Sequence, residues 1–126
     1  MIVADTHAVL WWTLEPARLG RRAAGAFADA DRIGVPTIVF WEVSVLLRRG
    51  KIEMQMPIAE WANRLLAIPR VAALPLDANV ALRADTLAMH PDPADRFIVA
   101  TAIELRSRLV TKDAAIRRSR TVETIW

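Results

Sequence analysis

The sequence predicts an α/β fold in which helices cover both faces of a central, mainly parallel sheet of about five strands, a three-layer α/β/α arrangement. Short apolar runs alternate along the chain with longer stretches whose apolar residues have helical spacing. The first run, MIVA, is apolar without alternation, which is typical of a parallel strand buried on both faces. At 126 residues the chain has the length of one domain, which we expect to span residues 1–126.

The expected elements follow one another without an internal repeat, a low-complexity tract or a linker. Their ends carry recognisable signals: Pro57 in a first helical turn, Asp77 as an N-terminal cap and Gly50 at a carboxyl end. The stretch PARLG, residues 16–20, has the character of a loop. The expected strands are residues 1–4, 32–37, 70–76, 108–111 and 121–125. The expected helices are residues 7–15, 21–30, 38–49, 57–68, 77–89, 91–106 and 112–118.

Composition excludes several classes of protein and favours others. The chain has no cysteine, which rules out disulfides, thiolate zinc sites and a cysteine nucleophile. No apolar run approaches the roughly eighteen residues that span a bilayer, so we expect no membrane segment. The amino end lacks a basic leader and is expected to be part of the fold, with a cytoplasmic location. A hydrophobic fraction of 54% is high for a soluble monomer and predicts an interface with a partner or a second copy.

Four carboxylates are predicted to meet at one edge of the sheet. Asp5 directly follows the first strand, and Asp113 comes two residues after the fourth. Glu42 and Asp95 each lie on an otherwise apolar helix face, where an unpaired charge is costly. In open parallel sheets, functional groups gather beyond the carboxyl ends of the strands. An all-oxygen cluster suits Mg²⁺ or Mn²⁺, which can activate water and orient a phosphodiester.

Each acid also has a purely structural explanation. Asp5 and Asp113 are placed to cap the helices that follow them. Glu42 can pair with an arginine, and Asp95 is an acid in a first helical turn, favoured by the helix dipole. The occurrence of all four at one sheet edge, two of them on apolar faces, favours the metal site.

The segments MIVADTHAVLWW, WEVSVLLRRGKI, DPADRFIVATA and LVTKD resemble the successive motifs of PIN-domain proteins. Their order and spacing are similar to those of VapC-type toxins of bacterial toxin–antitoxin pairs, over nearly the whole chain. The resemblance implies a PIN-like fold and an endoribonuclease that depends on Mg²⁺ or Mn²⁺ and is inhibited by a VapB-type antitoxin. It also implies a homodimer, and RNA products with a 5′-phosphate and a 3′-hydroxyl.

The resemblance also assigns residues. It places Asp5, Glu42, Asp95 and Asp113 on the family's acidic quartet. Asp5 and Asp95 would be the principal metal ligands, and the other two would complete the pocket or bind through water. The polar residues that match supporting positions are Thr6 and Thr111.

Other polar residues near these motifs are interpreted as structural. We expect His7 to be a neutral, packed side chain, because hard cations prefer oxygen ligands. His90 and Asp92 lie in a predicted loop, with Asp92 as a turn residue, and Arg96 is expected to form a structural ion pair. The net charge of +3 and a pI near 10.5 weakly favour a polyanionic partner such as RNA. The basic residues that we expect to contact the RNA backbone are Arg117, Arg118 and Arg120.

Two other enzyme or signalling classes fit less well. An aspartyl-phosphate phosphatase would need an aspartate two residues after Asp5, where His7 stands. A phosphorylatable receiver module would need an acidic pair at the first strand, where Asp5 is alone. A catalytically silent PIN module that binds RNA or an antitoxin stays open as the alternative to the nuclease.

Overall fold

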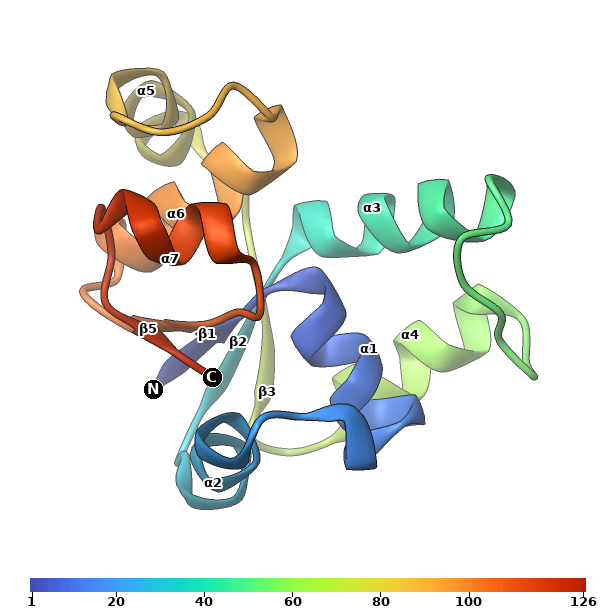
Figure 1. Cartoon of the computed structure of the whole chain (residues 1–126). Helices are drawn as coiled ribbons and strands as arrows, with labels where there is room; N and C mark the ends of the chain where they lie inside the picture. The colour runs from blue at the N-terminus through green and yellow to red at the C-terminus, as the bar shows by residue number, and fades with distance from the viewer.

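Five strands form one sheet in the computed structural model, which describes residues 1–126 (Figure 1). The strands are β1 (Ile2–Ala4), β2 (Ile33–Pro36), β3 (Val71–Leu74), β4 (Arg108–Val110) and β5 (Thr124–Ile125). Every pair of neighbours is parallel, and the order across the sheet is β3-β2-β1-β4-β5. The predicted parallel sheet of about five strands is therefore confirmed.

Seven α-helices and one short 3₁₀ turn connect the strands. Figure 1 shows the sheet nearly edge-on between α6 and α7 on one side and α1 and α4 on the other. This confirms the predicted three layers. None of the helices is long and apolar enough to cross a membrane. The helices are α1 (Thr6–Leu14), α2 (Arg21–Asp29), α3 (Thr37–Arg48), α4 (Ile58–Ala67), α5 (Ala78–Thr86), α6 (Pro93–Glu104) and α7 (Ala114–Ser119), and the 3₁₀ turn is Pro16–Arg18.

The strand order reverses its direction at β1. From β1 the chain builds outward through β2 to β3, then crosses back to β4 and continues to β5. Right-handed crossovers on the two sides of β1 place their helices on opposite faces. Ala4 pairs with Val110, so the residues that follow β1 and β4 leave the sheet side by side. This is the switch point at which ligands bind in open α/β sheets.

The hydrophobic core lies between the sheet and the helices that cover it. β1 is buried along its whole length, as its unbroken apolar run predicted. Trp61 and Leu65 face the core from α4, in the predicted helical stripe. Trp12 stacks on Phe27 with ring centroids 4.7 Å apart and an interplanar angle of 5°, which joins α1 to α2. The core thus holds α1 rigidly against β1, just where Asp5 connects them.

Helix α3 extends away from the sheet, and the chain returns toward it through α4 (Figure 1). The end of α3 matches its predicted glycine signal, because Gly50 has φ +66° two residues beyond the last helical residue. Glu42 lies in the middle of α3, between the core-facing Val39 and Val43.

Several elements are shorter than predicted, and the reason is visible for the last strand and for α5. The last strand covers residues 124–125 instead of 121–125, because residues 119–121 form the exit from α7. There Arg120 has φ +54° and the hydroxyls of Ser119 and Thr121 are hydrogen-bonded at 2.9 Å. Helix α5 ends at Thr86 instead of residue 89, since the guanidinium of Arg96 binds the carbonyl of Leu87 at 3.1 Å.

Candidate metal centre

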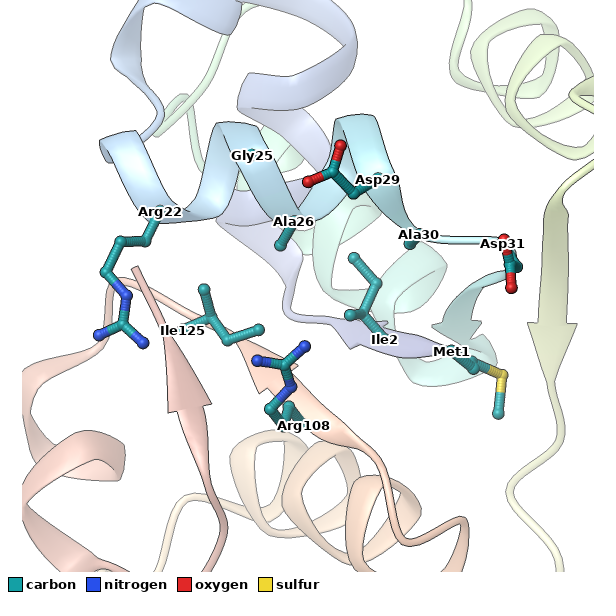
Figure 2. A pocket seen from close by; sticks show the side chains of 10 residues that line it. All are labelled: Met1, Ile2, Arg22, Gly25, Ala26, Asp29, Ala30, Asp31, Arg108 and Ile125. Carbon is teal, nitrogen blue, oxygen red and sulfur yellow. The ribbon is translucent and has the colours of Figure 1, made fainter.

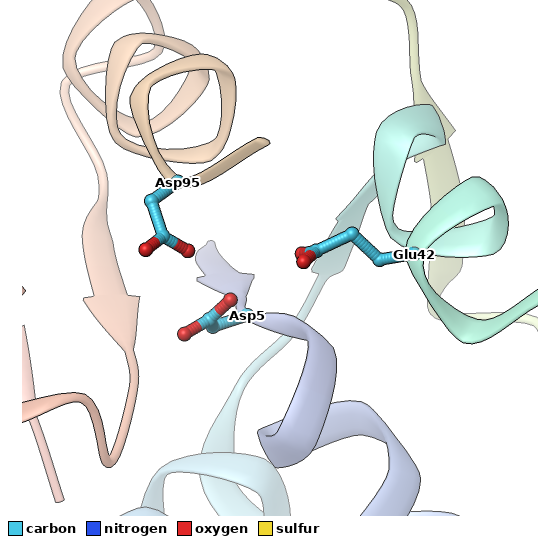
Figure 3. A group of neighbouring side chains, drawn as sticks. All are labelled: Asp5, Glu42 and Asp95. Carbon is cyan, nitrogen blue, oxygen red and sulfur yellow. The ribbon is translucent and has the colours of Figure 1, made fainter. Parts of the chain in front are cut away.

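Three carboxylates from three different elements converge beyond the carboxyl ends of β1 and β4 (Figure 3). Asp5 caps the amino end of α1, Glu42 comes from α3 and Asp95 from the first turn of α6. One oxygen from each lies within 4.8 Å of the oxygens of the other two. Their side chains point toward one another in Figure 3, although 90 residue positions separate the first acid from the last.

Asp5 is held at both carboxylate oxygens. The backbone N–H of Thr6 donates to Oδ1 at 2.7 Å, and the hydroxyl of Thr111 donates to Oδ2 at 2.6 Å. The residue is only 7% exposed. Burial raises the pKa of Asp5 to about 6, despite the two hydrogen bonds that favour its charged form. The carboxylate therefore has a single orientation, aimed into the cluster.

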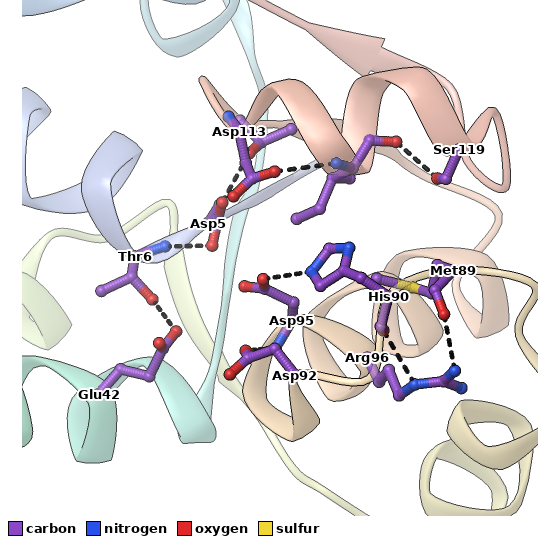
Figure 4. Close-up of polar contacts among 12 residues, drawn as sticks. Asp5, Thr6, Glu42, Met89, His90, Asp92, Asp95, Arg96, Asp113 and Ser119 are labelled. Carbon is purple, nitrogen blue, oxygen red and sulfur yellow. Dashed lines mark hydrogen bonds and ion pairs between the residues drawn. The ribbon is translucent and has the colours of Figure 1, made fainter.

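Glu42 is stabilised by a hydroxyl and not by an arginine. The Thr6 hydroxyl donates to Oε1 of Glu42 at 2.6 Å, which is its only hydrogen bond to the protein (Figure 4). Burial is the main cause that raises the pKa of Glu42 to about 7, and the charges of Asp5 and Asp95 add to it. Thr6 thus links the first two acids, through its N–H to one and its hydroxyl to the other.

Asp95 has a partner that sequence reasoning missed. Nε2 of His90 lies 2.7 Å from Oδ2 of Asp95, and the backbone N–H of Asp95 donates to Asp92 Oδ2 at 3.0 Å (Figure 4). Burial raises the pKa of Asp95. The sequence held a partial signal, since two prolines between the histidine and the acid prevent one continuous helix and let the chain fold back.

Asp92 and Asp113 complete the acidic lining. Both are helix caps: Asp92 accepts from Asp95 N at the start of α6, and Asp113 accepts from Ile116 N at 2.9 Å at the start of α7. Both also line a pocket of about 350 Å³ that contains the three converging acids and no hydrophobic residue. The prediction of Asp92 as a turn residue was therefore incomplete, because it also faces the acids.

The aspartates at this edge of the sheet cap helices and also line the acid pocket. The amino ends of α1, α6 and α7 all face the pocket, capped by Asp5, Asp92 and Asp113. The positive ends of the helix dipoles favour negative charge there. The structural explanation for each aspartate is thus correct, and it does not compete with the metal-site interpretation.

Arg96 does not form the predicted ion pair. Its guanidinium donates to one carbonyl in the last turn of α5, that of Ala84 at 2.9 Å, and to three in the connection between α5 and α6, those of Leu87 at 3.1 Å, Met89 at 2.8 Å and His90 at 3.1 Å. The side chain turns away from the acids, toward the segment that carries His90 (Figure 4). It therefore fixes the loop from which His90 reaches Asp95.

The basic residues around the pocket differ from the expected ones. Lys112 lines it, with Nζ 4.6 Å from the centre of the Trp11 ring. His7 also lines it, and burial together with the charges of Lys112 and Arg18 lowers its pKa, in keeping with a neutral histidine. The predicted RNA contacts are exposed residues on and just after α7 that do not line the pocket, and their role stays a prediction: Arg117, Arg118 and Arg120.

A second hollow, of about 480 Å³, lies at the opposite edge of the sheet (Figure 2). Its charged residues are two arginines and two aspartates, all exposed, and none of them forms an ion pair. These four are Arg22, Arg108, Asp29 and Asp31. The two aspartates of this hollow belong to no group of potential metal ligands, in contrast to the acids of the acid pocket.

The donor set of the acid pocket fits a hard divalent cation. All its convergent ligands are carboxylate oxygens, which Mg²⁺ and Mn²⁺ prefer. No lysine or arginine forms an ion pair with Asp5, Glu42 or Asp95. Burial is the main cause of the raised pKa values of these three acids, and the neighbouring carboxylates add to it.

The fold and the site define a class: doubly wound α/β proteins with a cluster of carboxylates at the switch point of a parallel sheet. The profile of the PIN domain matches residues 2–121, and the chain belongs to the PIN domain family. It is 34% identical to Ribonuclease VapC22 of Mycobacterium tuberculosis (strain ATCC 25618 / H37Rv), over 99% of this chain and 98% of that protein. The family resemblance seen in the motifs is thereby confirmed.

Solved structures share the fold. One is the crystal structure of VapBC2 from Rickettsia felis bound to a DNA fragment from their promoter, with a TM-score of 0.69 and 16% identity over 98% of this chain and 97% of that one. Another is a toxin–antitoxin complex from Klebsiella pneumoniae, with a TM-score of 0.66 and 20% identity over 97% and 95% of the two chains.

Proposed function

We propose that this protein is a VapC-type toxin, an endoribonuclease that hydrolyses RNA phosphodiester bonds with Mg²⁺ or Mn²⁺. The observation that carries the proposal is the convergence of Asp5, Glu42 and Asp95, with one oxygen of each within 4.8 Å of the others. RNA as the substrate is supported by the 34% identity to a protein named a ribonuclease.

The protein side chains have distinct tasks in this proposal. Asp5 and Asp95 are the principal ligands, and Glu42 and Asp113 complete the pocket directly or through water. A bound divalent cation would supply activation of water and neutralisation of charge at the phosphate. Asp5 is kept in its binding orientation by Thr111 and Thr6.

Asp95 and Glu42 are also oriented by hydrogen bonds. His90 fixes one oxygen of Asp95, and the hydroxyl of Thr6 fixes one oxygen of Glu42. Groups that hold metal-ligating carboxylates in place contribute to metal affinity. Lys112, the only lysine or arginine in the lining, is available to the phosphate. The one hydroxyl in the lining, that of Thr6, already donates to Glu42, and the chain has no cysteine, so the proposed nucleophile is water activated by the cation.

The proposed partners are a VapB-type antitoxin and a second copy of this chain. Support for the antitoxin comes from the fold neighbours, two of which were solved as VapBC or toxin–antitoxin complexes. Support for the homodimer comes from the hydrophobic fraction of 54% and from large apolar side chains left in solvent, such as Leu82 at 72% exposure.

The proposal is tested by incubating the purified protein with a mixed RNA pool in Mg²⁺, Mn²⁺ or EDTA, beside Asp95→Asn. We expect cutting that requires the metal and falls by at least 100-fold in the variant, because the variant loses a charged ligand. Asp29→Asn, an exposed aspartate at the opposite sheet edge, is the matched control and is expected to cut normally.

Equal cutting by the wild type and Asp95→Asn would contradict the assignment of the site. RNA binding by the wild type, without cutting in either metal, would instead favour the catalytically silent module that binds RNA or an antitoxin.

A further inference from the structure

A cleft of about 530 Å³ opens beside the acid pocket. Its walls are α3, the residues that follow α3, the start of α6 and His7 on α1. His7, Glu42 and Asp92 line both the cleft and the acid pocket, so the two spaces lie side by side with these residues between them. An RNA strand cut in the acid pocket must continue on both sides of the cleaved bond. The cleft offers space next to the pocket for one of these sides. Its volume is in the range of pockets that hold small organic ligands.

Trp41 forms part of the wall of the cleft, next to Glu42 in the sequence. It is 59% exposed, and it is the only aromatic residue of the chain that is exposed instead of buried or half-buried. Its ring pairs with no other aromatic ring. An indole that lies open beside a cleft offers a flat apolar face on which a base can stack.

Charge is distributed unequally along the cleft. The acids Glu42 and Asp92 lie at the end shared with the acid pocket. Arg49 and Lys51 also line the cleft, and neither takes part in an ion pair. Arg49 is seven positions beyond Glu42 along the helix and its cap, a rise of about 10 Å. The cleft thus has a cation-binding end, an aromatic wall and a basic end.

We infer that this cleft holds the RNA nucleotide next to the cleaved phosphate, with its base on Trp41 and the following phosphate at Arg49 and Lys51. The inference rests on the proposed nuclease function and adds the path of the substrate to it. The order of groups along the cleft matches a nucleotide, with one phosphate at the metal end and the next at the basic end. This arrangement favours RNA over a polypeptide as the occupant.

The test measures binding of a short labelled single-stranded RNA of mixed sequence, in Ca²⁺ and over a series of salt concentrations. Trp41→Ala is expected to weaken binding roughly 10-fold, since stacking contributes about 1–3 kcal/mol per base. Trp41→Phe keeps an aromatic face and is expected to stay near the wild type. The double variant Arg49→Ala/Lys51→Ala is expected to lower the slope of log K against log salt by about 0.7, the value for one phosphate contact to a single strand.

Two control variants test whether substitutions outside the cleft affect RNA binding. Leu82→Ala removes an exposed apolar side chain outside the cleft and is expected to bind RNA normally. The double variant Arg21→Ala/Arg22→Ala removes exposed basic residues of α2 that do not line the cleft, and its salt slope is expected to equal that of the wild type. All the substituted side chains are exposed, so circular dichroism is expected to show a native fold for each variant.

RNA binding at wild-type strength in both Trp41→Ala and Arg49→Ala/Lys51→Ala would overturn the inference. Loss of antitoxin binding in these variants, with RNA binding intact, would overturn it too and assign the cleft to the antitoxin. Failure of the proposed function is a different result, namely no metal-dependent cutting by the wild type. The nuclease proposal would survive if the cleft variants bound and cut RNA normally.

Discussion

Glu42 is a half-buried carboxylate whose single hydrogen-bond donor is the hydroxyl of Thr6. One neutral donor does not compensate an ionised carboxylate that also faces Asp5 and Asp95. In the metal-free protein the folded state therefore favours the protonated form of Glu42, with its pKa raised from 4.5 to about 7. A bound cation would reverse this preference, because it favours the ionised form.

Replacing Glu42 with glutamine tests this charge directly. A carboxyl with a raised pKa in the folded state stabilises the protein fully below its unfolded pKa, and that contribution is lost as the pH rises from about 4.5 to about 7. We expect metal-free Glu42→Gln to melt a few degrees above the wild type at pH 8, and the difference to shrink toward zero near pH 5. Glutamine keeps an oxygen that accepts from Thr6, so the hydrogen bond is preserved.

The measurement is thermal unfolding in EDTA across this pH range. Glu53→Gln, an exposed glutamate outside the pocket, is the control and is expected to follow the wild type at every pH. A melting temperature of Glu42→Gln at pH 8 equal to or below that of the wild type would show that Glu42 carries no unfavourable charge.

The connection between α5 and α6 is the element that depends most on one side chain. Arg96 binds three carbonyls there and a fourth, that of Ala84, in the last turn of α5, where helix carbonyls have no partner within the helix. The same connection carries His90, whose ring reaches Asp95. The position of Asp95 is thus tied to the packing of a loop.

For this element we predict that Arg96→Ala lowers the free energy of unfolding by about 2 kcal/mol, because hydrogen bonds to charged groups contribute about 1.5–3 kcal/mol and part of this is recovered from water. Urea denaturation measures the change. Arg118→Ala removes an arginine of α7 without such bonds and is expected to stay within about 0.5 kcal/mol of the wild type. A loss below 0.5 kcal/mol in Arg96→Ala would mean that the four bonds do not hold the loop.

Only the complete fold joins the acids. Asp5 follows a central strand, Glu42 lies on the helix that extends from the sheet, and Asp95 begins a helix of the opposite layer. A cation bound by all three would connect these elements in the folded protein and would not find such a site in the unfolded chain. Metal binding and global stability are therefore coupled.

We accordingly expect Mn²⁺ to raise the melting temperature. At a concentration about 100 times its dissociation constant, the gain is about 2.7 kcal/mol, which corresponds to several degrees. Asp95→Asn is expected to lose most of this gain, whereas Asp29→Asn at the opposite sheet edge keeps it. An equal gain in both variants would indicate binding elsewhere on the surface.

Much of the fold was predictable because it depends on local patterns. The apolar run of β1 indicated a strand buried on both faces, and Asp77 and Gly50 marked helix ends that the structure contains. The strand assigned to residues 121–125 was too long, because the hydroxyls of Ser119 and Thr121 close a turn there. Side-chain hydrogen bonds of this kind compete with backbone pairing and leave no periodic signal.

By itself, the sequence determined the succession of strands and helices along the chain, the family, and the four acids at the sheet edge. Periodicity, helix-end signals and motif spacing can all be seen in the sequence without knowledge of the fold. Tertiary structure alone decided which groups orient those acids: Thr6 for Glu42, and His90 for Asp95. It also turned Arg96 away from the acids, toward the backbone. The physical reason is that a hydrogen-bond partner is chosen by the direction of a side chain and by the packing of distant segments, which spacing along the chain does not encode.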